Sequence, residues 1–100
     1  MSRVLIERRL FDVAQRLKRA REELAVIDEQ LAALSEAADE ARVRSLVSET
    51  PLAQREYSEA KRHADAMERS RRTVEADVAE LAATQDELLD RLVSSDLPDA

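Results

Sequence analysis

The sequence contains no glycine and only two prolines, so it has few of the residues that make tight turns between strands. One phenylalanine, one tyrosine and no tryptophan leave too little bulk for an ordinary globular core. Burial must therefore come from a long line of aliphatic side chains. The absence of cysteine excludes disulfides, thiol catalysis and cysteine-based metal sites.

Charged residues make up 38% of the 100 residues, and Ala, Leu, Glu and Arg are the dominant residue types. This balance is typical of long helices and coiled coils. The net charge of −6 argues against a general affinity for nucleic acid or anionic lipid. No signal peptide is recognised and no apolar run approaches the roughly 20 residues that span a bilayer, so we expect no membrane partner and a cytoplasmic location.

The first half of the chain has a single heptad pattern. Its apolar residues recur at alternating steps of four and three, which predicts one amphipathic helix with a coiled-coil face. We call these heptad a and d residues the seam. In this half the seam consists of Ile6, Leu10, Val13, Leu17, Ala20, Leu24, Ile27, Leu31, Leu34, Ala38 and Ala41.

The stretch Ser48-Glu49-Thr50-Pro51 interrupts this pattern. Thr50 suits the N-cap of a new helix, and Pro51 suits its first position. Extending the first phase beyond Pro51 would place charged residues on the seam, so one continuous helix is excluded. After Pro51 the seam resumes in a new phase at Ala53, Tyr57, Ala60, Ala64, Met67, Arg71, Val74, Val78, Leu81, Gln85, Leu88 and Leu92.

The two halves of the seam match when the chain folds back on itself. Pairing Leu17 with Leu81 also pairs Leu10 with Leu88, and the centre of this register falls at residue 49. Large residues then face small ones across many layers. We predict an all-α fold, an antiparallel two-helix coiled-coil hairpin forming one domain over 1–100. It has a helix over 3–47, a turn over 48–50, a helix over 51–94 and a loose tail over 95–100.

Two polar residues, Arg71 and Gln85, interrupt the second half of the seam. Polar residues at such positions commonly fix register and partner choice at a cost in stability. Arg71 can also extend toward Glu68, Glu75 or Asp28, keeping its guanidinium in water. The alternative is that both residues meet polar groups of a partner chain.

An apolar flank beside the seam is predicted as an interface. A two-helix hairpin cannot cover this flank itself, and exposed apolar patches usually mark interaction sites. We expect a second copy to cover it, giving a homodimeric four-helix assembly; a different protein partner or an uncovered stripe are the alternatives. The apolar flank consists of Val4, Phe11, Ala14, Ala79, Ala82, Leu89 and Val93.

Other candidate sites have ordinary explanations. The basic group is interpreted as a solvated face, because no aromatic residues alternate with it to stack on bases. His63 and Glu59 offer two ligands, whereas zinc sites take three or four. With no nucleophile–base pair or glycine-rich phosphate loop, we expect neither a cofactor nor an enzyme. The basic group comprises Arg8, Arg9, Arg16, Lys18, Arg19 and Arg21.

The segment Glu56-Tyr57-Ser58-Glu59-Ala60-Lys61, with Ala41-Arg42 before the turn, resembles the N-terminal coiled-coil hairpin of Gre-type transcript cleavage factors. Those factors insert a hairpin tip into the secondary channel of RNA polymerase. Their Gly-Asp-Leu tip is replaced here by Leu46-Val47-Ser48-Glu49-Thr50-Pro51, in which only Glu49 is acidic. The resemblance therefore implies a tip that contacts RNA polymerase without cleavage chemistry.

Two functions follow as expectations. The first is a non-enzymatic coiled-coil scaffold or adaptor that self-associates through the open end of the hairpin. The second is a transcription-regulating factor that presents its tip, Ser48 to Pro51, to RNA polymerase. The sequence does not identify the protein partner.

Overall fold

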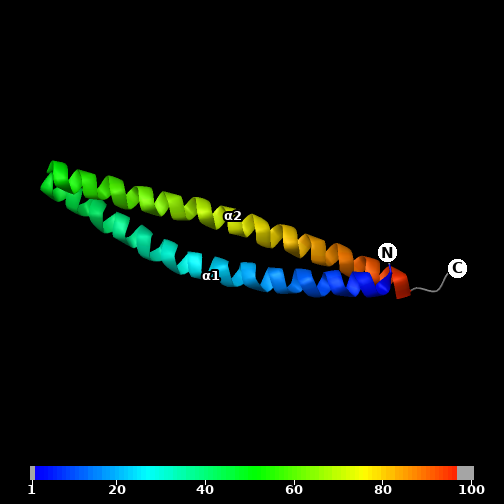
Figure 1. Cartoon of the computed structure of the whole chain (residues 1–100). Coiled ribbons are helices and arrows are strands. Elements are labelled where there is room, and N and C mark those ends of the chain that lie inside the picture. Colours follow the sequence, from blue (N-terminus) through cyan, green and yellow to red (C-terminus); the bar gives the residue numbers. More distant parts are fainter. Residues whose placement is uncertain (1, 97–100) are drawn as a thin grey trace. The chain divides into compact units, whose positions relative to one another are not determined.

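The computed structural model describes residues 2–96, which form two long helices and no strand. Helix α1 is Arg3–Ser48 and helix α2 is Pro51–Asp96 (Figure 1). The all-α class and the two long helices are confirmed. α1 ends one residue later than the predicted 47. α2 ends two residues later than the predicted 94, so residues 95 and 96 are helical rather than part of the predicted tail. The rest of that tail, 97–100, lies outside the described residues.

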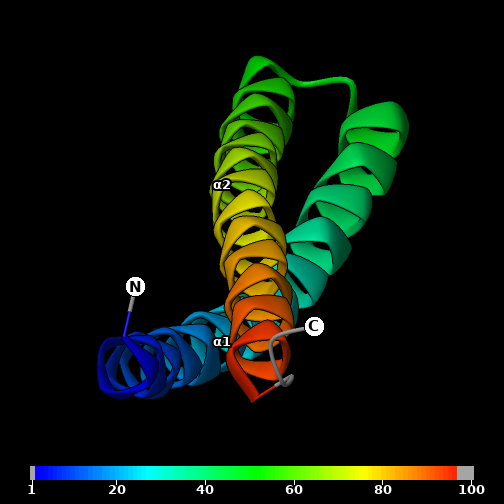
Figure 2. The same cartoon turned by 90° about the vertical axis from the view of Figure 1, so that its right-hand side faces the viewer.

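The chain divides into two compact units, and each contains part of both helices. We call residues 1–23 with 74–100 the terminal unit, and residues 24–73 the turn unit. In the turn unit, the two-residue connection places the end of α1 beside the start of α2 (Figure 2). Ala38, Ala41 and Ala53 are buried there, and their small side chains allow the helices to approach closely.

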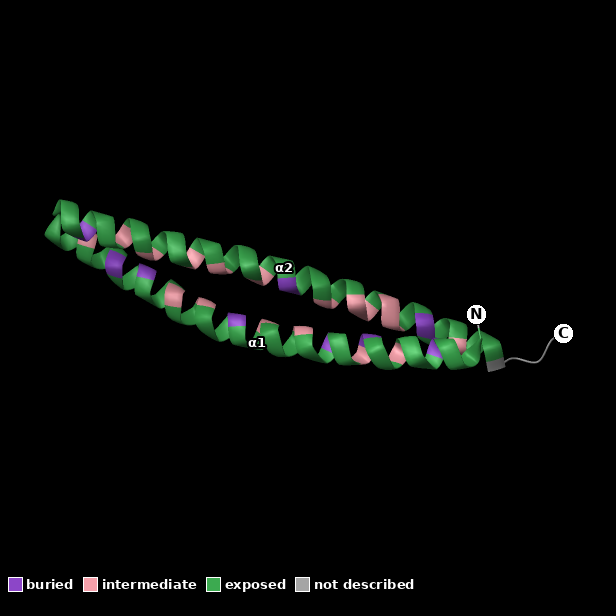
Figure 3. Cartoon of the chain, viewed as in Figure 1, coloured by how far each residue is buried: buried purple, intermediate pink, exposed green. Residues whose placement is uncertain are grey.

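The seam residues are the ones withdrawn from solvent in both helices. Every predicted seam residue is buried or half-buried (Figure 3). Among the other described residues, only Ala14, Ser45, Ala82 and Thr84 are not classed as exposed. The predicted helical phase is therefore confirmed before and after the turn, including its shift at Pro51.

The core of the terminal unit is aliphatic. Ile6, Val13 and Leu88 form a buried cluster, and the partly buried residues packed against it are Leu10, Leu81 and Leu92. These residues come from the start of α1 and the end of α2, so the two helices contact each other in this unit. Leu17 is also only 2% exposed. Stabilisation here comes from many modest contacts, because no aromatic side chain contributes to the cluster.

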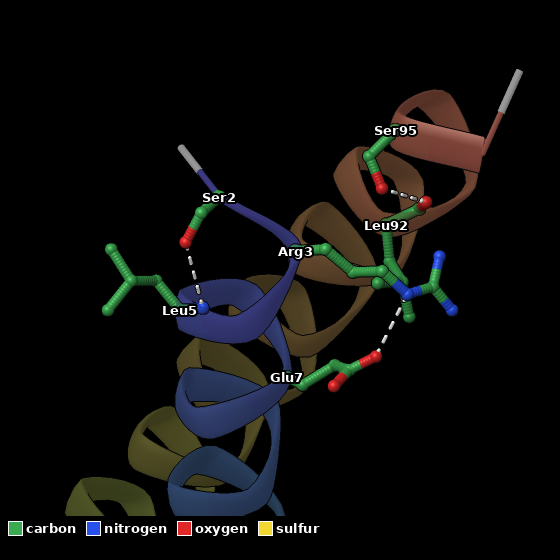
Figure 4. A network of polar contacts seen from close by, with 6 residues as sticks. All are labelled: Ser2, Arg3, Leu5, Glu7, Leu92 and Ser95. Atoms are coloured by element: carbon green, nitrogen blue, oxygen red, sulfur yellow. Dashed lines mark hydrogen bonds and ion pairs between the residues drawn. The ribbon is translucent and has the colours of Figure 1, made fainter. Parts of the chain in front are cut away.

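α1 begins with a cap that our sequence analysis did not identify. The backbone N–H of Leu5 donates to Ser2 Oγ at 3.3 Å (Figure 4). The backbone N–H of Ile6 donates to the Ser2 carbonyl at 3.1 Å. The adjacent turn carries an Arg3–Glu7 ion pair with 3.0 Å between Nε and Oε1. Serine is a favoured N-cap because its hydroxyl accepts from the otherwise unpaired first N–H groups. The sequence signal for this N-cap is Ser2 itself, which stands directly before the residues of the first helix.

The turn between the helices is built without glycine. Glu49 has a φ of 49° and so lies in the left-handed region, and its N–H donates to the Ser45 carbonyl at 3.1 Å. This is the common way of ending a helix, but glycine usually occupies that position. The Ala53 N–H donates to Thr50 Oγ1 at 3.1 Å and Pro51 is the first residue of α2, so both predicted capping roles are confirmed.

Truncating Leu17 to alanine should lower the free energy of unfolding by about 2–5 kcal/mol, because the side chain is almost fully buried. Denaturant unfolding followed by circular dichroism measures this change. The matched control is Leu46→Ala, which makes the same truncation on a 65% exposed side chain of the same helix. The control should change stability by less than about 0.5 kcal/mol. Equal effects in the two variants would contradict the seam assignment.

Replacing Glu49 with glycine should raise the melting temperature. A non-glycine residue in the left-handed region costs roughly 1–2 kcal/mol, and glycine removes that cost while losing part of the gain to its greater freedom when unfolded. A net gain of about 1 kcal/mol is expected from thermal unfolding. Glu56→Gly, at an interior position of α2, is the control and should instead lower stability by about 1 kcal/mol.

Candidate interaction surfaces

The apolar flank lies entirely within the terminal unit. Its four largest side chains are exposed, with Phe11 at 69%, Val93 at 61%, Val4 at 57% and Leu89 at 44%. Ala79 is exposed as well, whereas Ala14 and Ala82 are half-buried at the edge of the seam. A phenylalanine this exposed is unusual for a side chain that gains much from leaving water.

The heptad positions explain why one chain leaves this flank uncovered. With Leu10 at position a, Phe11 is at b and Ala14 at e, while Ala82 and Leu89 occupy e in α2. Position e points roughly 70° and position b roughly 130° away from the middle of the a/d seam, because successive helical residues are about 100° apart. The contacts between α1 and α2 in this unit bury a and d, so they cannot also cover e and b.

The e positions are polar in the turn unit. They are Asp28, Ser35, Arg42, Gln54, Lys61 and Glu68. All six are exposed, and two of them carry ion pairs. The apolar e positions of the flank therefore do not continue into the turn unit.

The other side of the terminal unit is a charged groove of about 650 Å³. Four of the six predicted basic residues line it, namely Arg8, Arg9, Arg16 and Arg19. Four carboxylates line it as well, at Asp12, Glu23, Asp77 and Glu80, so the arginines give no excess of positive charge. A balanced groove of this kind lacks the basic surface that binds a nucleic-acid backbone.

The polar residue Arg71 is half-buried in the seam of the turn unit. Its Nε donates to Asp28 Oδ1 across the two helices. The two side chains are 34% and 49% exposed, so the pair contributes only about 0–1 kcal/mol. Asp28 is one of the three partners predicted for Arg71. Gln85 is half-buried in the terminal unit.

The tip carries more apolar surface than the sequence analysis recognised. Ser48, Glu49, Thr50 and Pro51 are exposed as a group. Beside them is the tip cluster, four exposed aliphatic residues that we did not single out: Val43 at 60%, Leu46 at 65%, Val47 at 79% and Leu52 at 63%. A signal was present, because the first three have i, i+3, i+4 spacing on a helix face outside the seam.

Metal and membrane sites were also considered. His63 and Glu59 are both exposed. Within residues 2–96, no group of three or more His, Cys, Asp or Glu side chains is placed to hold a metal ion. Neither helix, over its described residues, combines the length and apolar character needed to cross a bilayer.

Comparison with known proteins finds no match to a family model, a curated protein or a solved structure. The resemblance of residues 56–61 to Gre-type factors therefore stays a prediction. The apolar flank and the tip carry exposed apolar residues that folding of the single chain does not explain.

Proposed function

We propose that this chain is a non-enzymatic interaction protein, an antiparallel two-helix coiled-coil hairpin that self-associates through the apolar flank and serves as a scaffold or adaptor. The confirmed seam phase supports the hairpin. The core of the terminal unit supports it too, because Leu10 and Leu88 belong to one cluster, as do Ile6 and Leu92. These are pairs that the predicted antiparallel register brings together.

The observation that carries the proposal is the exposure of the flank. Phe11, Val93, Val4 and Leu89 form an apolar surface at positions that a single chain leaves in water. Burying such side chains yields about 25 cal/mol for each Å² removed from water. A second copy offers the same surface, and two-fold pairing of identical patches is the commonest form of protein assembly.

The placement of the hydroxyl groups supports a non-enzymatic role. Ser45, Thr73, Thr84 and Ser95 each donate to a backbone carbonyl three or four residues earlier in their own helix. A nucleophilic hydroxyl instead needs a base within hydrogen-bond reach. His63, the only histidine in the sequence, is exposed.

Sedimentation tests the self-association. The wild-type chain should be dimeric at micromolar concentration, and Leu89→Glu should shift it to monomer because a carboxylate would be buried in the interface. Leu52→Glu is the control, since it makes the same change at an exposed leucine of the tip. That control should stay dimeric, and circular dichroism should show unchanged helicity in both variants. A monomeric wild type would refute self-association.

A second function remains as a proposal because the tip is exposed and apolar. A factor that enters a channel of RNA polymerase needs a tip free to contact another protein, and the tip cluster provides aliphatic side chains for such contact. Glu49 is the one acidic residue of the segment Ser48 to Pro51. A single carboxylate there does not supply the cleavage chemistry of Gre-type factors, so this second function is regulatory.

Immobilised wild-type chain should retain RNA polymerase from a cell extract if this second function is correct. A variant with Glu49→Ala and Pro51→Ala should lose that retention, whereas Leu89→Glu should keep it because its change lies in the terminal unit. Absence of retention by the wild type, or equal retention by the tip variant, would remove this function.

A further inference from the structure

Side-chain size changes systematically along the apolar flank. Val4, Leu89 and Val93 lie toward the open end of the terminal unit, and Phe11 is in the middle. The three alanines lie farther in, at positions 14, 79 and 82. The flank therefore has a protruding outer part and a shallow inner part, with its largest side chain between them.

The antiparallel register sets which flank residues lie at the same level. Since Leu10 is level with Leu88, the e and b positions of the two helices fall into successive levels, and the five outermost levels contain the flank. Polar residues share three of these levels with apolar ones. From the open end inward, the levels are Val4 with Val93, Glu7 with Leu89, Phe11 with Asp86, Ala14 with Ala82, and Lys18 with Ala79.

Two copies can meet flank to flank about a two-fold axis in two ways. If they run in the same direction, α1 of one copy faces α2 of the other at the same level. Phe11 would then face Asp86, and Leu89 would face Glu7, whose carboxylate is already paired with Arg3. This arrangement would set the two largest apolar side chains against carboxylates and Ala14 against Ala82, so large apolar side chains would not face small ones.

If the copies run in opposite directions, each helix faces its own counterpart. With the axis at the level of Phe11, the two Phe11 rings meet each other and Val93 faces Ala79. Leu89 then lies over Ala82, and Val4 lies over the aliphatic stem of Lys18. Large side chains fill the space above small ones, and an aromatic pair forms at the centre.

We propose that two copies overlap in opposite directions through their terminal units, with Phe11 of both copies at the two-fold axis and the outer part of each flank over the inner alanines of the other. This inference rests on the proposed self-association and specifies its geometry. The same axis also brings the two Asp86 carboxylates near each other, so their repulsion limits the affinity of the dimer.

Single cysteines test the arrangement cleanly, because the natural chain has none. Phe11→Cys should form a disulfide-linked dimer with itself under mild oxidation. Val93→Cys alone should not, but mixed with a size-tagged Ala79→Cys chain it should give the mixed dimer. Val26→Cys, at a 52% exposed position of the turn unit, is the control and should stay monomeric on a non-reducing gel.

The outcomes separate the geometry from the function. Sedimentation of each variant under reducing conditions first establishes that a dimer is present, and its absence in the wild type would overturn the proposed function. If the dimer is present but Val4→Cys links to Val93→Cys while Phe11→Cys does not link to itself, the copies run in the same direction and the inference is wrong.

A change that leaves the apolar residues intact gives an independent check. Asp86→Asn should lower the dissociation constant of the dimer several-fold, because it removes the repulsion at the axis. Asp90→Asn, one turn farther along α2 and off the flank, is the matched control and should leave the constant unchanged. An unchanged constant for Asp86→Asn would place Asp86 away from the axis and overturn the arrangement.

Discussion

Each helix of this chain has one aliphatic stripe to bury, and that constraint governs everything else. The seam is made largely of leucine, valine, isoleucine and alanine, so no single side chain can dominate the packing. Leu17 and Leu88, both at 2% exposure, are among the best-buried large residues. Stability is instead spread along the helices, and surface outside the seam is left for other contacts.

Helical periodicity was sufficient to predict the burial pattern, because the a/d spacing alone determines which side of a helix meets its neighbour. The capping roles of Thr50 and Pro51 were predictable for a similar reason, as each residue type satisfies a specific need at a helix start. The left-handed Glu49 was not predictable, since glutamate has no preference for that region. The backbone conformation of Glu49 is imposed by the end of α1 before it and the Thr50 N-cap of α2 after it.

Ion pairs between exposed long side chains are harder to predict from the sequence than the seam. The predicted register places Arg16 near Asp77, and both line the charged groove. The energy of such exposed pairs is about 1 kcal/mol or less, too little to fix flexible side chains. Arg71 and Asp28 do pair, because the half-buried position of Arg71 restricts where its guanidinium can go.

The polar position Arg71 and the apolar position Phe11 are complementary departures from the simplest coiled coil. Arg71 puts a cation where burial would favour an aliphatic residue, and Phe11 puts an aromatic residue where solvent would favour a polar one. The first departure weakens the seam but disfavours other registers, because a shifted chain would separate Arg71 from Asp28. The second departure lowers the solubility of the isolated chain, because it exposes an aromatic side chain to water. It brings no benefit within that chain. A side chain whose exposure is unfavourable in the single chain becomes favourable when an assembly buries it. The same reasoning applies to every large residue of the apolar flank.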